Sequence, residues 1–258
     1  MTTALRPTVA TARTERGDVP TDRYMMMLRA RLELSSSEES AIRDAIAEVQ
    51  TISARTTFRR AGELYNHCAL LLDGLAYHYR DLATGARQIT QIHVPGDFVD
   101  LESFACQTFD HDSRTVTACR VAIVPHDRLA LLIEEHPNLT RAFWLSTNLN
   151  AAMHCEWMVT LGRRRAAAGL AALFCEMQVR LALVGLAGAS EYMLPLAQGE
   201  LGDCLGLTTV HVNRALRDLR ERGLVTFREN RVEIHDMPAL RKLADFDESY
   251  LLLPKTPR

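Results

Sequence analysis

A short run of side chains between residues 208 and 217 has the types and spacing to contact the edges of DNA bases. Val210, Asn213, Arg214 and Arg217 follow the i, i+3, i+4, i+7 spacing that places side chains on one face of an α-helix. Arginine can donate two hydrogen bonds to a guanine, asparagine can pair with an adenine, and valine can pack on a thymine methyl group. Core packing does not call for an asparagine and two arginines in line, so this face predicts DNA contact.

Two short helices joined by a tight turn are expected to hold this face in place. Leu201, Leu205 and Leu207 would seat a first helix and its turn, and Gly206 lies where the chain must bend without a Cβ. Thr208 can cap the second helix by accepting a backbone N–H. The buried stripe of that second helix is then formed by Val212, Leu216 and Leu219.

The residues after the second helix predict a β-hairpin. Gly223 ends the helix, and residues 225–228 and 231–234 form two β-rich runs around the pair Glu229-Asn230. A hairpin directly after such a helix is a wing, which would bring its arginines near the DNA phosphates. The residues expected to contact DNA are Thr208, Thr209, Val210, His211, Asn213, Arg214, Arg217, Arg228 and Arg231.

The composition is that of a globular protein with room for two domains. The chain has 258 residues, of which 47% are hydrophobic and 24% charged, and its net charge is −2. Such a balance excludes a polycation that coats nucleic acid, although a local positive face is sufficient for sequence-specific binding. No apolar run approaches the ~20 residues of a membrane span, and no secretory signal is evident, so we expect a cytoplasmic protein.

Before the two-helix unit, the chain divides into three parts. Residues 1–33 are predicted to form a disordered tail, with Met25, Met26 or Met27 as possible alternative starts. A capping box, either Ser35 with Glu38 or Ser36 with Glu39, opens a helix through about residue 49. Short β-rich runs punctuated by glycine then fill residues 56–125 and suggest a β-barrel or sandwich.

A long apolar helix is predicted from Pro137 to Gly162, followed by a hinge at Arg163–Arg165 and another helix from Ala166 to about Val184. So much apolar surface must be buried, either within the domain or against a second copy of the chain. Residues 185–191 are expected to form a loop. The residues expected on a dimer helix are Ala142, Leu145, Leu149, Ala152, Met153 and Glu156.

Five short motifs, taken in order, resemble the CRP/FNR family of bacterial transcription regulators over about residues 34 to 235. They are R-R-A-G-E at 59–63, D-G at 73–74, V-P-G-D-F at 94–98, T-A-C-R-V-A-I-V-P at 117–125 and L-G-L-T-T-V-H-V-N-R-A-L at 205–216. The resemblance implies an α+β fold with a cyclic-nucleotide-binding-like β-barrel, a dimerisation helix and a C-terminal winged helix-turn-helix. We place these parts at 34–136, 137–162 and 163–258.

The resemblance also implies a homodimer that reads an inverted repeat in double-stranded DNA, and contact with RNA polymerase if the protein is an activator. Arg214 aligns with the arginine that contacts a guanine. Thr209-Val210 and Asn213 depart from the residues that many members carry there. We therefore expect a half-site that differs from the standard ones.

The pocket of the barrel departs from the cyclic-nucleotide pattern. The Gly-Glu pair that follows G-D-F in nucleotide binders is absent, and Asp100 brings negative charge to this region. We therefore expect a regulator that does not depend on cyclic AMP, with its small-molecule effector unknown. The residues of a possible effector pocket are Asp100, Glu102, Ser103, Arg114 and Thr115.

Histidines and cysteines offer alternatives that we consider weaker. Five histidines in or beside the barrel could each bind a haem iron: His67, His78, His93, His111 and His126. A lone histidine in a β-domain is more often a hydrogen-bonded structural residue, and the N-terminal cysteine cluster of oxygen-sensing family members is missing. The six scattered cysteines predict reduced, mostly buried thiols. We therefore expect no metal site and no cofactor.

Three further possibilities remain open at this point. Cys155 on the long helix could form a disulfide across a dimer, although a buried, inert thiol is expected. The chain could instead be a cyclic-nucleotide-binding module that acts on protein partners. Cys106, with Asp110 and His111, could form a catalytic cluster, but no oxyanion donor accompanies it, so we do not expect an enzyme.

Overall fold

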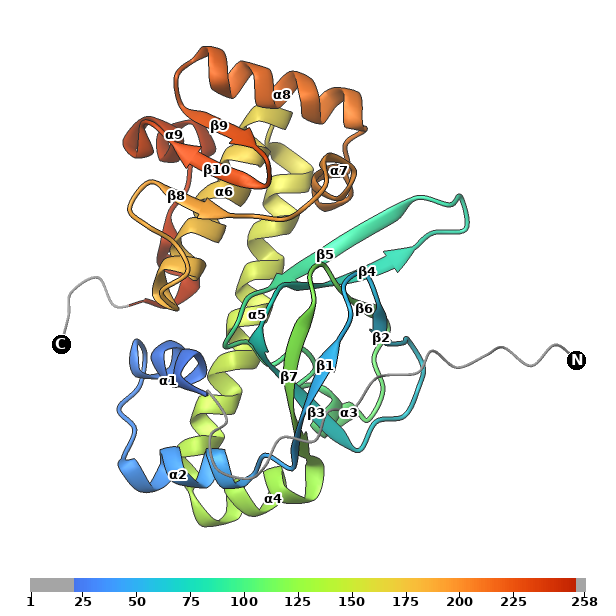
Figure 1. Cartoon of the computed structure of the whole chain (residues 1–258), viewed down its shortest axis with the longest axis vertical. Helices are drawn as coiled ribbons and strands as arrows, with labels where there is room; N and C mark the ends of the chain where they lie inside the picture. Colours follow the sequence, from blue (N-terminus) through green and yellow to red (C-terminus); the bar gives the residue numbers. More distant parts are fainter. Residues whose placement is uncertain (1–20, 254–258) are drawn as a thin grey trace, which may run out of the picture.

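A computed structural model describes residues 21–253. Figure 1 shows a long helix, α5 (Pro137–Arg163), that runs through the middle of the molecule. A β-barrel lies beside one half of this helix, and a smaller domain of helices and a sheet lies at its other end. The C-terminal half of α5 therefore connects the two domains. The sequence predicted a long apolar helix that begins at Pro137, and α5 begins at that residue.

Two helices precede the barrel, and the first corrects an expectation. Residues 22–33 were expected in a disordered tail, yet α1 (Asp22–Arg29) is a helix whose Tyr24, Met25 and Leu28 are buried. Those three side chains follow helical spacing, so one face of α1 can pack against the barrel and α5. The remainder of the expected tail, residues 1–20, lies outside the described residues.

The second helix, α2 (Ser36–Asp44), begins at the capping box that the sequence predicts. Ser35 accepts a hydrogen bond from the backbone of Glu38, and the Glu38 carboxylate accepts one from the Ser35 N–H at 2.8 Å. The helix ends at Asp44 rather than near residue 49, because the chain continues into the first strand. Val49 and Ile52 are buried on that strand.

The barrel consists of two antiparallel sheets. The first has the strand order β1 (Glu48–Ile52), β7 (Cys119–Pro125), β3 (His67–Asp73). The second has the order β2 (Thr57–Arg59), β6 (Asp112–Thr115), β4 (Ala76–Asp81), β5 (Arg87–His93). Two helices complete this domain. In the chain, α3 (Ser103–Cys106) lies between β5 and β6, and α4 (His126–Glu135) directly precedes α5. The expected barrel is confirmed.

The C-terminal domain starts at α6 (Ala166–Leu183), which is the core helix of that domain. By length and composition α6 could span a membrane, contrary to the expectation from the sequence, but most of it is buried inside the protein. The other elements are β8 (Glu191–Met193), α7 (Gln198–Leu205), α8 (Thr209–Glu221), β9 (Val225–Arg228), β10 (Arg231–Ile234), α9 (Met237–Ala244) and the 3₁₀ turn η1 (Glu248–Leu251).

One hydrophobic core runs from the barrel into the C-terminal domain. Ile89 and Ile92 on β5 pack in the same cluster as Met153 on α5 and Leu170 and Phe174 on α6. The hairpin of β4 and β5 also extends to α7 (Figure 1). The two domains are therefore docked on one another through apolar side chains.

Candidate nucleic-acid interface

Helix α8 begins and is buried as the sequence predicts. The Thr208 side chain accepts a hydrogen bond from the His211 N–H at 3.4 Å and so caps the helix. Val212, Ala215 and Leu219 are buried against α6 and α7, which fixes the rotation of α8 about its axis. The opposite face of α8 lies along the outer edge of the molecule, as Figure 1 shows.

The turn between α7 and α8 leaves no room for larger residues. Gly206 ends α7 with a φ of +63°, a left-handed conformation that favours glycine. At Gly202 an added Cβ would lie 2.4 Å from the carbonyl oxygen of Leu207, so the backbone of the turn packs directly on α7 at this glycine. These glycines fix the angle at which α8 leaves α7.

The exposed face of α8 presents the side chains expected to read bases. Val210 is 66% exposed, although α8 is otherwise polar on this side. Arg214 and Arg217 are exposed and form no ion pair within residues 21–253, so their guanidinium groups are available to DNA. Asn213 donates to the Thr209 carbonyl oxygen at 3.0 Å, and this bond must be exchanged if the amide is to pair with a base.

Two other expected contacts already bond to one another. The Thr208 hydroxyl lies 2.9 Å from His211 Nδ1, at the start of α8. Both residues are exposed, so their remaining polar atoms can still reach a phosphate at the helix N-terminus.

The hairpin of β9 and β10 forms at the residues expected for the wing, and β8 pairs with β10 as a third strand. Glu229 and Asn230 both have positive φ, +50° and +62°, as in a type I′ hairpin turn. Arg228 is exposed, whereas Arg231 forms an ion pair at 3.4 Å with Glu191 of β8. The loop expected at residues 185–191 ends one residue earlier, because Glu191 begins the strand β8, which pairs with β10.

The hinge contributes two arginines that the sequence analysis did not assign to this face. Arg163 and Arg165 line an open groove together with Arg214 and Arg217. The intervening Arg164 also lines this groove, but its guanidinium is already engaged, since it pairs with Glu156 at 2.6 Å and donates to the carbonyl oxygen of Ala244 at 2.7 Å. The run of three arginines was the available signal, and it was interpreted only as a hinge.

Three of the six residues expected on the dimer helix face the interior of the protomer and are not available to a second copy. Ala142, Leu149 and Met153 are all less than 10% exposed and pack in the hydrophobic clusters of their own chain. Leu145 faces α1, Ala152 is half-buried, and Glu156 is bound to Arg164. The most apolar face of α5 is used within the protomer.

A different face of α5 is exposed, and it has heptad spacing. Trp144 and Met158 are 71% and 63% exposed, and Ala151 lies midway between them. Thr147, His154 and Leu161 occupy the positions three residues later in each repeat. Cys155 is also exposed next to this seam, whereas a buried thiol was expected.

Most of the expected effector-pocket residues are used to hold the barrel together. Asp100 is buried, pairs with Arg59 and accepts the Ala69 N–H. The Thr115 hydroxyl donates to the Ser53 carbonyl oxygen at 2.7 Å. These contacts leave Asp100 and Thr115 unavailable to a nucleotide.

The other three expected pocket residues do not form one site. Ser103 is buried and its hydroxyl lies 3.1 Å from His126 Nε2. Arg114 lies opposite Tyr77 on the second sheet and is half-buried. Glu102 is half-buried, and burial raises the pKa of its carboxyl group to about 7.

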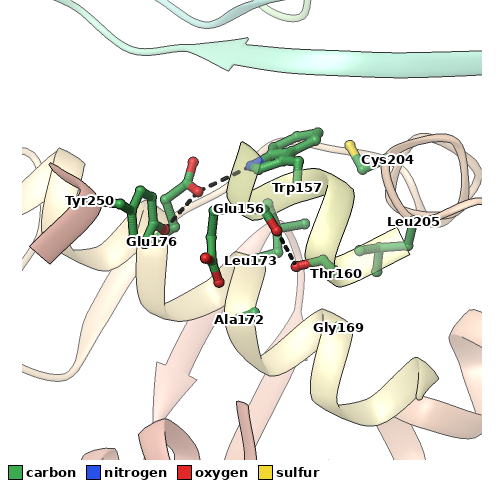
Figure 2. A pocket seen from close by; sticks show the side chains of 10 residues that line it. All are labelled: Glu156, Trp157, Thr160, Gly169, Ala172, Leu173, Glu176, Cys204, Leu205 and Tyr250. Atoms are coloured by element: carbon green, nitrogen blue, oxygen red, sulfur yellow. Dashed lines mark hydrogen bonds between the residues drawn. The ribbon is translucent and has the colours of Figure 1, made fainter. Parts of the chain in front are cut away.

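A buried polar network joins the barrel to the DNA-binding domain. Arg180 of α6 donates to Asp97 of the barrel at 2.7 Å, to Glu176 at 3.1 Å and to the Ile92 carbonyl oxygen at 2.8 Å. Figure 2 shows Trp157 of α5 and Tyr250 of η1 both donating to the Glu176 carboxylate, at 3.0 and 2.9 Å. One carboxylate therefore connects three helical segments at the domain junction.

Comparison with known proteins agrees with this geometry. Residues 169–243 match a family model described as a Crp-like helix-turn-helix domain, and residues 49–136 match the cyclic nucleotide-binding domain. The chain is 31% identical to the nitrogen fixation regulation protein FixK of Bradyrhizobium diazoefficiens over 67% of this chain and 72% of that protein. It is 23% identical to an anaerobic regulatory protein of Haemophilus influenzae over 86% of each.

A solved structure has the same arrangement of domains. The structure of FixK2 from Bradyrhizobium japonicum superposes with a TM-score of 0.70 and 26% identity, covering 77% of this chain and 97% of the other. The expected order of barrel, long helix and winged helix-turn-helix is thus confirmed.

Proposed function

This chain belongs to the CRP/FNR family of transcription regulators, and we propose that it acts as a homodimer on an inverted-repeat DNA site without requiring cyclic AMP. The observation that carries the proposal is the exposed face of α8. Arg214 and Arg217 project from it without an ion-pair partner among residues 21–253, beside a 66%-exposed valine. On this face Val210 could pack on a thymine methyl group beside the hydrogen bonds that the arginines would donate to base edges.

The contacts divide into those that read bases and those that hold phosphates. On α8, Val210, Asn213 and Arg214 are placed to enter the major groove. Arg228 of the wing and Arg165 at the start of α6 lie at the edges of this surface and are expected to bind phosphates. Their number sets how steeply binding falls with salt.

Dimerisation would occur along the exposed seam of α5. Trp144, Ala151 and Met158 fall on one stripe, and an exposed stripe of this length on a globular protein needs a partner. A second copy of α5 provides a matching stripe about a two-fold axis. Each protomer would then present one α8, and the pair would read the two halves of a symmetric site.

The interior of the barrel supports independence from cyclic AMP. The Asp100 carboxylate is already paired with Arg59, and Thr115 is bonded to the backbone. Neither is free to bind a ribose or a phosphate. A protein that reads chromosomal DNA acts in the cytoplasm, and contact with RNA polymerase would follow if it activates transcription.

Selection of bound sequences from a random duplex pool tests the proposal. The purified full chain is used with and without cyclic AMP, and one inverted repeat should be recovered equally in both conditions. Recovery only with cyclic AMP would show that the nucleotide is required. Recovery of a single half-site would refute the homodimer, and no enrichment would favour a module that acts on protein partners.

Arg228→Ala serves as a second arm of this test. The wing arginine should weaken binding to the selected site and to random DNA alike and reduce the slope of log K against log salt by about 1. A loss confined to the selected site would show that Arg228 reads bases.

A further inference from the structure

Three imidazoles and one carboxylate converge inside the barrel. His78 on β4 and His93 on β5 have their Nε2 atoms 3.0 Å apart. His111, just before β6, lies over His78 with 4.0 Å between the ring centroids, and its Nε2 is 3.6 Å from a carboxylate oxygen of Glu102. The cluster lies on the side of the barrel that faces α5, where His154 is close enough to affect the pKa of both His78 and His93.

Two nitrogen atoms of this cluster lack a partner. His111 Nε2 and His93 Nδ1 are both buried and accept or donate no hydrogen bond within the described residues. Buried polar atoms are almost always bonded, so the unbonded Nε2 of His111, which lies beside the Glu102 carboxylate, indicates a missing occupant there. For His93 the nearest carboxylate oxygen, on Asp97, is 3.8 Å from Nδ1.

The geometry of the histidines fits the neutral form that binds metals. The Nε2 atoms of His78 and His93 lie 3.0 Å apart, and a hydrogen bond between them needs a lone pair on one of the two nitrogens, so at least one of the rings is neutral. Asp110 lies 3.2 Å from His111 Nδ1 and favours the proton on that nitrogen, which leaves the lone pair on Nε2. A carboxylate behind a histidine in this way is the usual support of a metal ligand.

We propose that His78, Glu102 and His111 bind one divalent transition-metal ion, with His93 beside them as a fourth donor. The ligand atoms of the first three lie within 4.8 Å of one another. Ligands about 2.0–2.2 Å from a tetrahedral zinc ion are about 3.3–3.6 Å apart. The 3.6 Å between His111 Nε2 and Glu102 falls in that range, and the other separations among the three ligand atoms, which are at most 4.8 Å, must shorten when an ion binds.

The donor set selects the class of ion. Imidazole nitrogens with a single carboxylate suit zinc, cobalt, nickel or ferrous iron. Calcium and magnesium prefer oxygen ligands throughout, which this cluster does not offer. Glu102 and His111 are the outer pair, with side chains 34% and 15% exposed, so the ion can enter past them from solvent.

The site is connected to the DNA-binding domain by one carboxylate. The Asp97 oxygen that is 3.8 Å from His93 Nδ1 is the same oxygen that accepts from Arg180 of α6 at 2.7 Å. An ion bound at His93 Nε2 would make its Nδ1–H a stronger donor towards Asp97. Metal occupancy would thereby compete for the acceptor that holds α6 against the barrel.

Cobalt binding to the full chain, without an affinity tag, tests the proposal and does not depend on the proposed DNA site. The chelator-treated protein is titrated with cobalt chloride alone and monitored by visible absorption, and zinc chloride is then added in competition. We expect one equivalent per chain, absorption bands of cobalt bound by nitrogen and oxygen ligands, their loss on zinc addition, and a higher Tm with zinc.

The variants are chosen at the partly exposed ligands so that the barrel stays folded. His111→Ala and Glu102→Gln should each abolish the bands and the rise in Tm, whereas His67→Gln, a barrel histidine outside the cluster, should retain both. Circular dichroism verifies that each variant is folded. Absence of cobalt uptake by the folded wild-type chain would overturn the proposal, as would uptake that survives both His111→Ala and Glu102→Gln.

Discussion

Replacing Arg180 by methionine should be among the most damaging single changes to this protein. The side chain is 5% exposed and forms two ion pairs, with Asp97 at 2.7 Å and with Glu176 at 3.1 Å. Methionine fills much of the same volume, so the change removes the charge and the hydrogen bonds with little loss of packing. Both carboxylates then remain buried without their cation.

The expected loss in the free energy of unfolding depends on the hydrogen bonds that the two carboxylates keep after the substitution. Removing one partner of a buried ion pair costs about 3–5 kcal/mol, because the other charge is left uncompensated. Asp97 still accepts from the Val94 N–H at 2.8 Å, and Glu176 still accepts from Trp157 and Tyr250. These remaining bonds place the expected loss near the lower end, at about 3 kcal/mol.

Urea unfolding followed by circular dichroism measures the loss. With a slope of about 3 kcal/mol per molar urea, the midpoint should fall by about 1 M. Combining Arg180→Met with Asp97→Asn and Glu176→Gln removes the stranded charges, so the triple variant should recover most of that stability. Arg29→Met removes an exposed cation from its pair with the buried Glu39, which keeps Arg43 as a second partner, and should lose less than about 1 kcal/mol. A loss for Arg180→Met no larger than for Arg29→Met would refute the reasoning, as would a triple variant less stable than Arg180→Met.

Three other predictions concern the DNA-binding and dimer surfaces. Arg214→Ala should weaken binding to the selected site by about 1–3 kcal/mol and relax discrimination at one base pair, measured by competition with single-base variants; equal losses on random DNA would contradict its role as a base reader. Met158→Glu should yield monomers in analytical ultracentrifugation, while the same change at Leu64, exposed but far from the seam, should leave the assembly state unchanged. Gly202→Ala should lower the free energy of unfolding by about 1–3 kcal/mol, since its Cβ would meet the Leu207 carbonyl oxygen; an unchanged urea midpoint would show that the α7–α8 turn can widen.

The DNA-reading unit could be predicted from the sequence because its signals are local. Thr208 as a cap, Gly206 as a left-handed turn and Glu229-Asn230 as a hairpin turn each act on their immediate neighbours, and all three appear in the structure. The start of α5 at Pro137 was predictable for the same reason. Such features need no knowledge of distant parts of the chain.

What could not be predicted depends on contacts between distant segments. On α5, the apolar periodicity identified a buried face but could not say whether a second copy or the barrel buries it, and the barrel does. β8 was missed because a three-residue strand is defined by its partner β10 rather than by its own pattern. The cluster of His78, Glu102 and His111 has no spacing to recognise, since the barrel topology alone brings these residues together.

The two ends of the described chain are also fastened together. Arg31, just after α1, donates from Nε and Nη2 to the Leu251 carbonyl oxygen at 3.1 and 2.9 Å, across 220 residues of sequence. During synthesis the residues of the barrel leave the ribosome before residue 251 is added, so Arg31 lacks this acceptor until the C-terminal domain has been made. A truncation before η1 would therefore remove the Arg31 and Tyr250 contacts, while the apolar core shared by the two domains, the Arg180–Asp97 pair and every residue of α8 would stay in place.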